Sequence, residues 1–238
     1  MKKNTNEKNN VINITKNLIS RPEMGVLIPL IFLFIVIGFV NPNFFAINNL
    51  IDILRSGSYT FVIAAPLTLL MISGGMDLSI GATTALGCVV CAWGLADFKI
   101  GITLSILIAL FAGALVGIIK ATLVVKFNLP AFIITLALTK IVNSFILVTT
   151  DGIAVANLGS DAFKVLGQGK TVGGIHWTII IAIIIGIGMH ILLTKTRYGR
   201  EVAACGGNRE TAKLAGINVA KTRYIVEVLV SLFSAFCG

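Results

Sequence analysis

Residues 194–223 read TKTRYGREVAACGGNRETAKLAGINVAKTR, a strongly basic segment between two long apolar runs. Seven of these residues are Lys or Arg and only two are Glu. Cytoplasmic loops of membrane proteins are enriched in Lys and Arg, so this excess indicates which side of a bilayer the segment faces. We therefore predict a cytoplasmic loop over residues 194–221.

The centre of this loop has the start and stop signals of a short helix between Cys205 and Gly216. Asn208 can cap the helix N-terminus, because its side-chain oxygen can accept from the first free backbone N–H groups. Gly216 can adopt the left-handed conformation that ends a helix. A capped helix on a basic loop is suited to contact another protein.

The composition predicts a polytopic membrane protein. Hydrophobic residues make up 56% of the chain, charged residues 12%, and the mean hydropathy is +0.96. This leaves too little polar material to cover a water-soluble globule. The net charge of +9 does not indicate nucleic-acid binding, because the charges lie before and between apolar runs and are not interleaved with aromatic residues on one surface.

A bilayer core about 30 Å thick requires about 20 apolar helical residues per crossing. Seven segments approach this length, which predicts an all-α transmembrane bundle. They are residues 24–40, 50–72, 79–96, 100–125, 131–149, 175–193 and 222–238. Residues 1–23 form a basic, Asn-rich cytoplasmic tail without a signal-cleavage site, and residues 24–238 form the membrane domain.

Charge tests this topology independently. Alternating the loops places fourteen Lys or Arg inside, Lys120 and Lys126 among them, against Lys99, Lys164 and Lys170 outside. That distribution satisfies the positive-inside rule. The last apolar run reaches Gly238 without a polar flank, so we expect the membrane domain to be incomplete at its C-terminus.

We expect no catalytic residue, metal or cofactor in this chain. It has no nucleotide-binding glycine loop, nucleophile elbow or H-E-x-x-H motif. Cys88 and Cys91 lie inside an apolar run, and no second Cys or His pair completes a zinc site. His176 and His190 likewise have no second ligand in view.

Residues 73–81, SGGMDLSIG, interrupt two apolar runs. Non-helical backbone at membrane depth is tolerated only where protein or a water-filled cavity satisfies its polar groups. Asp77 and Ser79 can each cap the helix that follows. The segment is either a capped turn at the membrane surface or part of a functional interior, and the sequence leaves both open. The residues that define the turn are Gly74, Gly75, Asp77, Ser79 and Gly81.

Lys140 lies near the middle of an apolar span, with Asn143 and Ser144 on the same helical face. A lysine at the centre of a membrane helix costs roughly 2.5 to 3.5 kcal/mol on insertion scales. We expect Lys140 to face the bundle interior, a cavity or a carboxylate; snorkelling to the interface is the alternative.

Three motifs resemble the permease subunits of bacterial ABC sugar importers, the branch for ribose, xylose, galactosides and autoinducer-2. GGMDLSIG at residues 74–81 is similar to the G-G-I-D-L-S-V-G of that branch. FIITL at 132–136 resembles its F-I-x-T-L. The basic loop resembles its G-R…G-G-N…A…L-x-G-I pattern, through YGR at 198–200, GGN at 206–208, Ala212, Leu214 and AGI at 215–217.

The resemblance implies a fold of about ten spans and a dimeric pore in the bacterial inner membrane. Its partners would be a cytoplasmic ABC ATPase that carries ATP and Mg²⁺, an extracytoplasmic sugar-binding protein and a second permease subunit. The implied coupling residues, which dock into the ATPase, are Gly206, Gly207, Asn208, Arg209, Glu210, Ala212, Leu214, Ala215, Gly216 and Ile217. The candidate substrate pathway comprises Phe132, Thr135, Lys140 and Asn143.

The implied substrate is a ribose-like monosaccharide. The branch often has Arg-Gly where this chain has Asn143-Ser144, and the motifs do not separate sugar importers from those for branched-chain amino acids or nucleosides. An ion-coupled carrier, with Lys140 and Asp77 as intramembrane charges, is a further alternative. That alternative leaves the capped basic loop unexplained.

Overall fold

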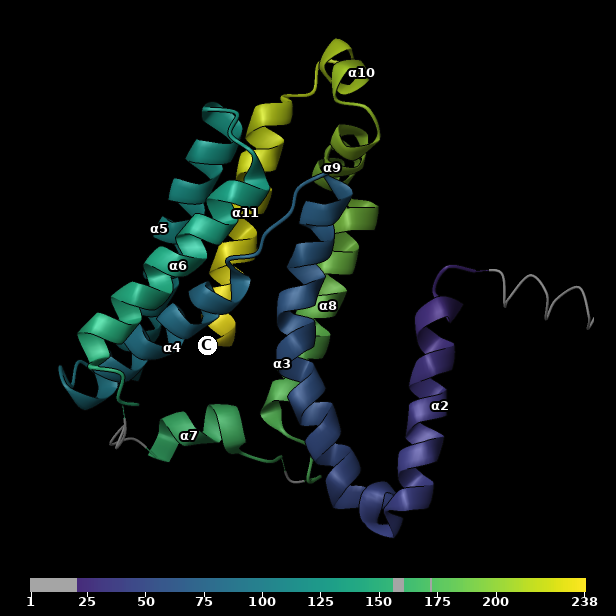
Figure 1. Cartoon of the computed structure of the whole chain (residues 1–238), viewed down its shortest axis with the longest axis vertical. Helices are drawn as coiled ribbons and strands as arrows, with labels where there is room; N and C mark the ends of the chain where they lie inside the picture. Colours follow the sequence, from purple (N-terminus) through teal and green to yellow (C-terminus); the bar gives the residue numbers. More distant parts are fainter. Residues whose placement is uncertain (1–20, 156–160, 172) are drawn as a thin grey trace, which may run out of the picture. The chain divides into compact units, whose positions relative to one another are not determined.

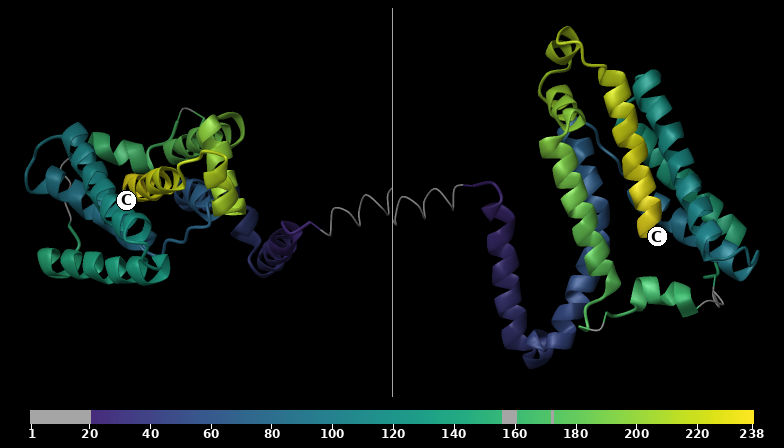
Figure 2. Two further views of the ribbon diagram at one scale, coloured as in Figure 1. Left: turned by 90° about the horizontal axis from the view of Figure 1, so that it is seen from above. Right: turned by 180° about the vertical axis from the view of Figure 1, so that it is seen from behind.

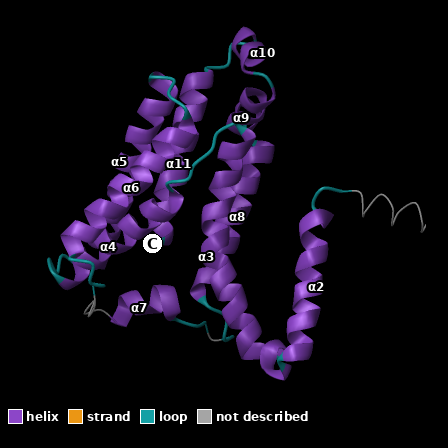
Figure 3. Cartoon of the chain, in the orientation of Figure 1, coloured by secondary structure: helices purple, strands orange, loops and turns teal. Residues whose placement is uncertain are grey.

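The computed structural model describes residues 21–155, 161–171 and 173–238. Within these ranges the regular structure is helical, apart from one isolated bridge between Lys170 and His176 (Figure 3). The chain divides into two compact units, Met1–Ile53 and Leu54–Gly238. The fold class predicted from composition is confirmed.

The described part of the first unit begins with helix α2 (Met24–Val40), which buries none of its side chains. The short 3-10 helix η1 (Pro42–Phe45) follows, and the Asn41 side chain accepts from the Asn43 backbone N–H at its start. The rings of Phe34 and Phe44 pack edge to face, with centroids 5.3 Å apart. An apolar helix with an unburied surface is suited to lipid contact.

The second unit begins within α3 (Ile47–Ile72), which crosses the boundary between the units. Its other helices are α4 (Ile80–Ala96), α5 (Ile102–Ala121) with a π-helical extension η2 (Thr122–Lys126), α6 (Ala131–Thr150), α7 (Asp161–Gln168), α8 (Trp177–Lys195), α9 (Arg197–Gly207), α10 (Arg209–Leu214) and α11 (Val219–Cys237) (Figure 1). Each predicted apolar segment corresponds to one long helix, and when α5 is taken together with η2 no end is shifted by more than three residues.

Among the described residues, four helices are long and apolar enough to cross a membrane by length and composition: Ile47–Ile72, Ile102–Lys126, Ala131–Thr150 and Trp177–Lys195. The helices Met24–Val40 and Ile80–Ala96 are apolar but shorter. These helices support a polytopic membrane bundle. The total of seven spans stays a prediction.

Small residues let α11 pack closely against α4 and α5, and α11 runs beside α5 in both ribbon views (Figures 1 and 2). A Cβ atom at Gly117 would lie 2.9 Å from both the Cβ of Ser231 and the Cα of Val228. At Gly113 it would lie 3.0 Å from the Ser231 carbonyl oxygen. The small-xxx-small spacing in α5 therefore serves helix packing.

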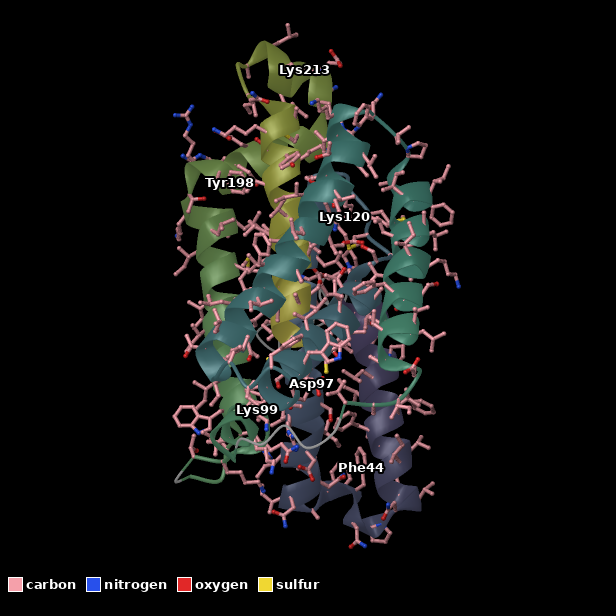
Figure 4. All side chains as sticks on the ribbon, turned by 90° about the vertical axis from the view of Figure 1, so that its left-hand side faces the viewer. Phe44, Asp97, Lys99, Lys120, Tyr198 and Lys213 are labelled. Carbon is pink, nitrogen blue, oxygen red and sulfur yellow. The ribbon has the colours of Figure 1, made fainter. Side chains whose placement is uncertain are left out.

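Helix α9 packs onto α3 and α11 through a buried apolar cluster around Val202. Val202 is fully buried against Leu69 and Leu70 of α3 and Val226 and Val230 of α11. Figure 1 places α9 and α10 at one end of this unit and α7 at the other. Figure 4 shows the same separation, with Tyr198 and Lys213 at one end, Asp97 and Lys99 at the other, and Lys120 between them.

Candidate functional site

The glycine turn between α3 and α4 is held in place by defined hydrogen bonds. The backbone N–H of Gly75 donates to Leu70 O (2.9 Å) and that of Gly74 to Met71 O (3.0 Å). Gly74 has a φ of 75°, the left-handed conformation that this pair of hydrogen bonds requires. The Ser73 hydroxyl also donates to Leu70 O (2.7 Å). These contacts end α3 and turn the chain away from its axis.

The turn then continues past α11 to the start of α4 (Figure 1). Asp77 Oδ1 accepts from the backbone N–H of Ser79 (2.7 Å) and from its hydroxyl (2.6 Å). The expectation that Asp77 and Ser79 cap α4 is wrong, because Ser79 makes no side-chain cap and Asp77 bonds to a residue before the helix. Thr139 of α6 donates to Leu78 O (3.0 Å) and holds the turn from another side.

Asp77 belongs to a buried ion cluster with Lys120 of α5 and Glu227 of α11. Lys120 Nζ pairs with Asp77 Oδ2, lies 3.2 Å from Glu227 Oε2 and donates to Ser231 Oγ (2.9 Å). All three charged side chains are at most 1% exposed. Lys120 is labelled inside the bundle in Figure 4. The three charges thus hold together the turn and two helices.

Lys120 is counted above among the charges on the cytoplasmic side, and the structure buries its side chain completely inside the bundle. The helix continues through η2 to Lys126, so Lys120 lies a full turn inside it. It follows Gly113 and Gly117 by seven and three residues, which places it on the face that packs against α11. That spacing was the sequence signal for burial. The sequence reasoning also missed Glu227, four residues before Ser231 on α11.

The segment proposed as the coupling helix has its predicted cap and end. Asn208 Oδ1 accepts from the backbone N–H groups of Glu210 and Thr211, both at 3.0 Å. Gly216 has a φ of 79°. The sequence missed α9, which forms a separate helix before this one and begins where the Thr196 hydroxyl accepts from the Gly199 N–H (3.1 Å).

A small apolar cluster fixes α10 against its neighbours. Ala212 is buried with Cys205 of α9 and Val219 of α11, and Ile217 packs against them. Ala212, one of the implied coupling residues, therefore points inward. Leu214 is 89% exposed. Burial raises the pKa of the Cys205 thiol, which keeps it protonated in its packing role.

Helices α9 and α10 contact the glycine turn and the end of α3. Arg209 Nη2 donates to Gly74 O (3.3 Å). A Cβ atom at Gly206 would overlap the carbonyl oxygen of Ile72 and lie 2.8 Å from its carbonyl carbon. At Gly207 a Cβ atom would meet nothing within 4 Å. Glycine at 206 therefore permits the end of α9 to approach the end of α3.

The candidate pathway residues of α6 lie on different faces. Thr135 is fully buried, and its hydroxyl donates to Ala131 O (2.8 Å) within its own helix. Phe132, Lys140 and Asn143 are exposed. Lys140 does not face the interior of this chain, because the buried face of α6 carries Thr135, Leu138 and Val142. The assignment of these four residues to a pathway stays a prediction.

In the described ranges, no group of three or more His, Cys, Asp or Glu side chains could hold a metal ion.

The remaining predicted residues have local contacts only. Glu210 forms an exposed ion pair with Lys213 (3.0 Å) within α10. Gly81, the last residue of the predicted turn, lies in the first turn of α4 with open space around it.

Comparison with known proteins finds one matching family and several similar import permeases. The family described as "Branched-chain amino acid transport system / permease component" matches residues 49–238. The ribose import permease protein RbsC of Escherichia coli (strain K12) is 33% identical over 220 residues, covering 91% of this chain and 68% of that protein. The fructose import permease protein FrcC of Rhizobium meliloti is 31% identical over 228 residues, covering 92% and 63%.

The galactose/methyl galactoside import permease protein MglC of Salmonella typhimurium is 31% identical over 232 residues, covering 91% of this chain and 69% of that protein. No solved structure matches.

Proposed function

Because the chain belongs to the permease family of the branched-chain amino acid transport system, we propose that it is the membrane subunit of an ATP-driven monosaccharide importer. The relatives carry the names of ribose, fructose and galactoside permeases, which supports a sugar substrate. The family description names branched-chain amino acids, so an amino-acid or nucleoside importer is the alternative.

The observation that carries the proposal is the α9–α10 segment. It is a capped helix, fixed by a buried cluster, that presents the exposed Leu214 at the end of the bundle away from α7. A rigid projection of this kind can transmit a movement, whereas a floppy loop cannot. We assign ATP hydrolysis, with its Mg²⁺, to a separate ABC ATPase that docks on this segment.

The chain is a multi-pass protein of the bacterial inner membrane. We place its N-terminal tail and residues 194–221 on the cytoplasmic side, which the excess of Lys and Arg supports. The ATPase would bind there, and an extracytoplasmic sugar-binding protein would deliver substrate on the other side. A second permease subunit, identical or related, would complete the pore.

Topology is tested by cysteine labelling. In a variant without native cysteines, Lys213→Cys should resist a membrane-impermeant maleimide in whole cells and react after permeabilisation. Labelling in intact cells would place the coupling segment outside and overturn the proposal.

Transport is tested in proteoliposomes that contain the chain, its ATPase and its binding protein. Uptake of labelled ribose, fructose or galactose should require ATP and survive collapse of ion gradients. Uptake of isoleucine or a nucleoside instead of a sugar would favour the related importer branch. Uptake that survives ATP depletion and stops when an ion gradient is removed would establish a secondary carrier.

Docking is tested by deleting residues 208–216. The variant should insert in the membrane and lose co-purification with the ATPase. Retained co-purification would refute the assignment of the coupling segment, which comprises α10 and its flanking glycines.

We also propose that the exposed side of α6 borders the substrate path, since Phe132, Lys140 and Asn143 lie on it. Lys140→Met should then change the KM for sugar uptake. Unchanged uptake kinetics would remove Lys140 from the path.

A further inference from the structure

The glycine turn at residues 74–81 and the basic loop that carries α9 and α10 are far apart in the sequence but form one continuous set of contacts. Arg209 of α10 donates to the carbonyl of Gly74, at the first residue of the turn after Ser73. The end of α9 is pressed against the end of α3 at Gly206 and Ile72. Movement of α9 and α10 would therefore displace the start of the glycine turn.

The other end of the turn is anchored in the ion cluster. Asp77 lies three residues beyond Gly74, and its carboxylate bonds to Ser79 and pairs with Lys120. Between these two points the Gly75 N–H bonds to Leu70 O, so the turn is stiff at its start as well as at its end. Lys120 connects onward to Glu227 of α11.

We propose that this route couples the ATPase to the membrane core: Arg209 and Lys120 are positioning residues that pass movement of α9 and α10, through the Gly74–Asp77 turn, to α5 and α11. The inference rests on the proposed function, because it presumes an ATPase that moves α10. It assigns to the glycine turn and to Lys120 a role that the docking helix alone does not provide.

The chemistry of the cluster suits such a junction. A buried ion pair adds little net stability compared with well-packed apolar side chains, because desolvation offsets the attraction. Breaking one partner is strongly unfavourable, so the charged groups tend to move together. The cluster joins Asp77 of the turn to Lys120 of α5 and Glu227 of α11. A displacement of the turn can therefore move both helices.

The proposed route is tested by measuring how much sugar is taken up per ATP hydrolysed. Arg209→Ala removes the donor to Gly74, while the control Lys195→Ala removes one exposed charge at the end of α8, outside α9 and α10. Both variants are assembled as full chains with the ATPase and the binding protein in proteoliposomes. Three quantities are measured: ATPase co-purification, ATP hydrolysis, and ribose taken up per ATP hydrolysed.

The resemblance counts Arg209 among the docking residues, but its guanidinium donates to Gly74 O. We therefore expect Arg209→Ala to bind the ATPase and to lower uptake per ATP by roughly three- to tenfold, within the range that mutations along a coupling route produce. Lys195→Ala should leave that ratio unchanged. An unchanged ratio in Arg209→Ala overturns the inference. Loss of ATPase binding in place of a lower ratio also overturns it, because Arg209 would then belong to the docking face.

The link to the ion cluster is tested by a mutant cycle. The charge-neutral variant Asp77→Asn/Lys120→Met/Glu227→Gln should lower the same ratio, and adding Arg209→Ala should lower it no further. Losses that multiply would show two independent routes and overturn the inference. If the neutral variant does not insert, the cycle uses Ser231→Ala, which removes only the hydroxyl partner of Lys120.

Failure of the proposed function can be told apart from failure of this inference. It would appear as absence of ATPase binding or of sugar uptake in the unmodified chain, before any variant is compared.

Discussion

Replacing Gly206 with alanine tests the close approach of α9 to the end of α3. The added methyl group would overlap the Ile72 carbonyl oxygen and lie 2.8 Å from the carbonyl carbon, and both atoms belong to the backbone. No side-chain rotation can relieve that contact, so α9 has to move away from α3. Gly207 is the matched control, because a methyl group there meets nothing within 4 Å.

The two substitutions share every effect except this contact. Both positions lie at the end of α9 and neither has a positive φ, so each alanine gains at most about 1 kcal/mol of helix propensity. Overpacking at Gly206 costs about 1 to 3 kcal/mol. We therefore expect Gly206→Ala to be less stable than Gly207→Ala by about 1 to 3 kcal/mol.

The assay is thermal unfolding of the purified chain in detergent. For a domain of 150 to 250 residues, about 1 kcal/mol shifts the Tm by roughly 2 to 4 °C. Gly206→Ala should thus unfold several degrees below Gly207→Ala. Equal Tm values would mean that α9 does not press against α3, and the contact route through the glycine turn would lose its first step.

Three further variants test the core and the cap. Lys120→Met leaves the Asp77 and Glu227 carboxylates unpaired and should lower the free energy of unfolding by about 3 to 5 kcal/mol, measured by denaturation in detergent. Asn208→Ala removes the cap of α10 and should cost about 1 kcal/mol, detected as faster amide hydrogen exchange in that helix. Gly117→Val should separate α5 from α11 and cost about 1 to 3 kcal/mol, measured as a lower Tm.

Each variant has a control. Neutralising both carboxylates together with Lys120 should recover most of the loss, and a triple variant as unstable as Lys120→Met would contradict the charge argument. Asn208→Asp keeps an acceptor and should exchange as slowly as the parent. Gly188→Ala on α8 meets nothing within 4 Å, so a similar Tm for it and Gly117→Val would argue against close packing of α5 on α11.

The sequence predicted the long helices well because polarity marks where an apolar run ends. Residues 24–40 coincide with α2, and α4 begins one residue after its predicted start. The short helices α7 and α9 were missed. Both lie in segments that charge and glycine content mark as loops, and α9 is fixed by burial of Val202 against α3 and α11, which only the tertiary structure provides.

The motifs of the candidate site were found, but their contacts were not. Asn208 and Gly216 act locally, and their roles followed from neighbouring backbone groups. Asp77 acts through Lys120, which lies 43 residues away in the sequence, and no local rule identifies that partner. The burial of Ala212 was not predicted for the same reason, since its face of α10 is set by Cys205 and Val219.

The contrast between Lys120 and Lys140 shows which local signal carries information about burial. Each lies in an apolar helix, and the insertion cost of a lysine alone does not say where its charge is compensated. Lys120 shares a face with Gly113 and Gly117, where α11 approaches closely, whereas Lys140 lies away from the buried residues Leu138 and Val142.

The same pattern occurs on α11. Glu227 precedes Ser231 and Ser234 by four and seven residues, so an acid lies on a face of small residues that packs against α5. Two such faces that meet bring a base and an acid together where both side chains are buried and where each charge would be costly alone. A charge at helical spacing from small residues thus indicates a partner on the neighbouring helix. The spacing is informative only where a neighbouring helix approaches that face: Lys140 has Ala137 and Ser144 three residues before and four after it, yet it lies on the exposed side of α6, away from Leu138 and Val142.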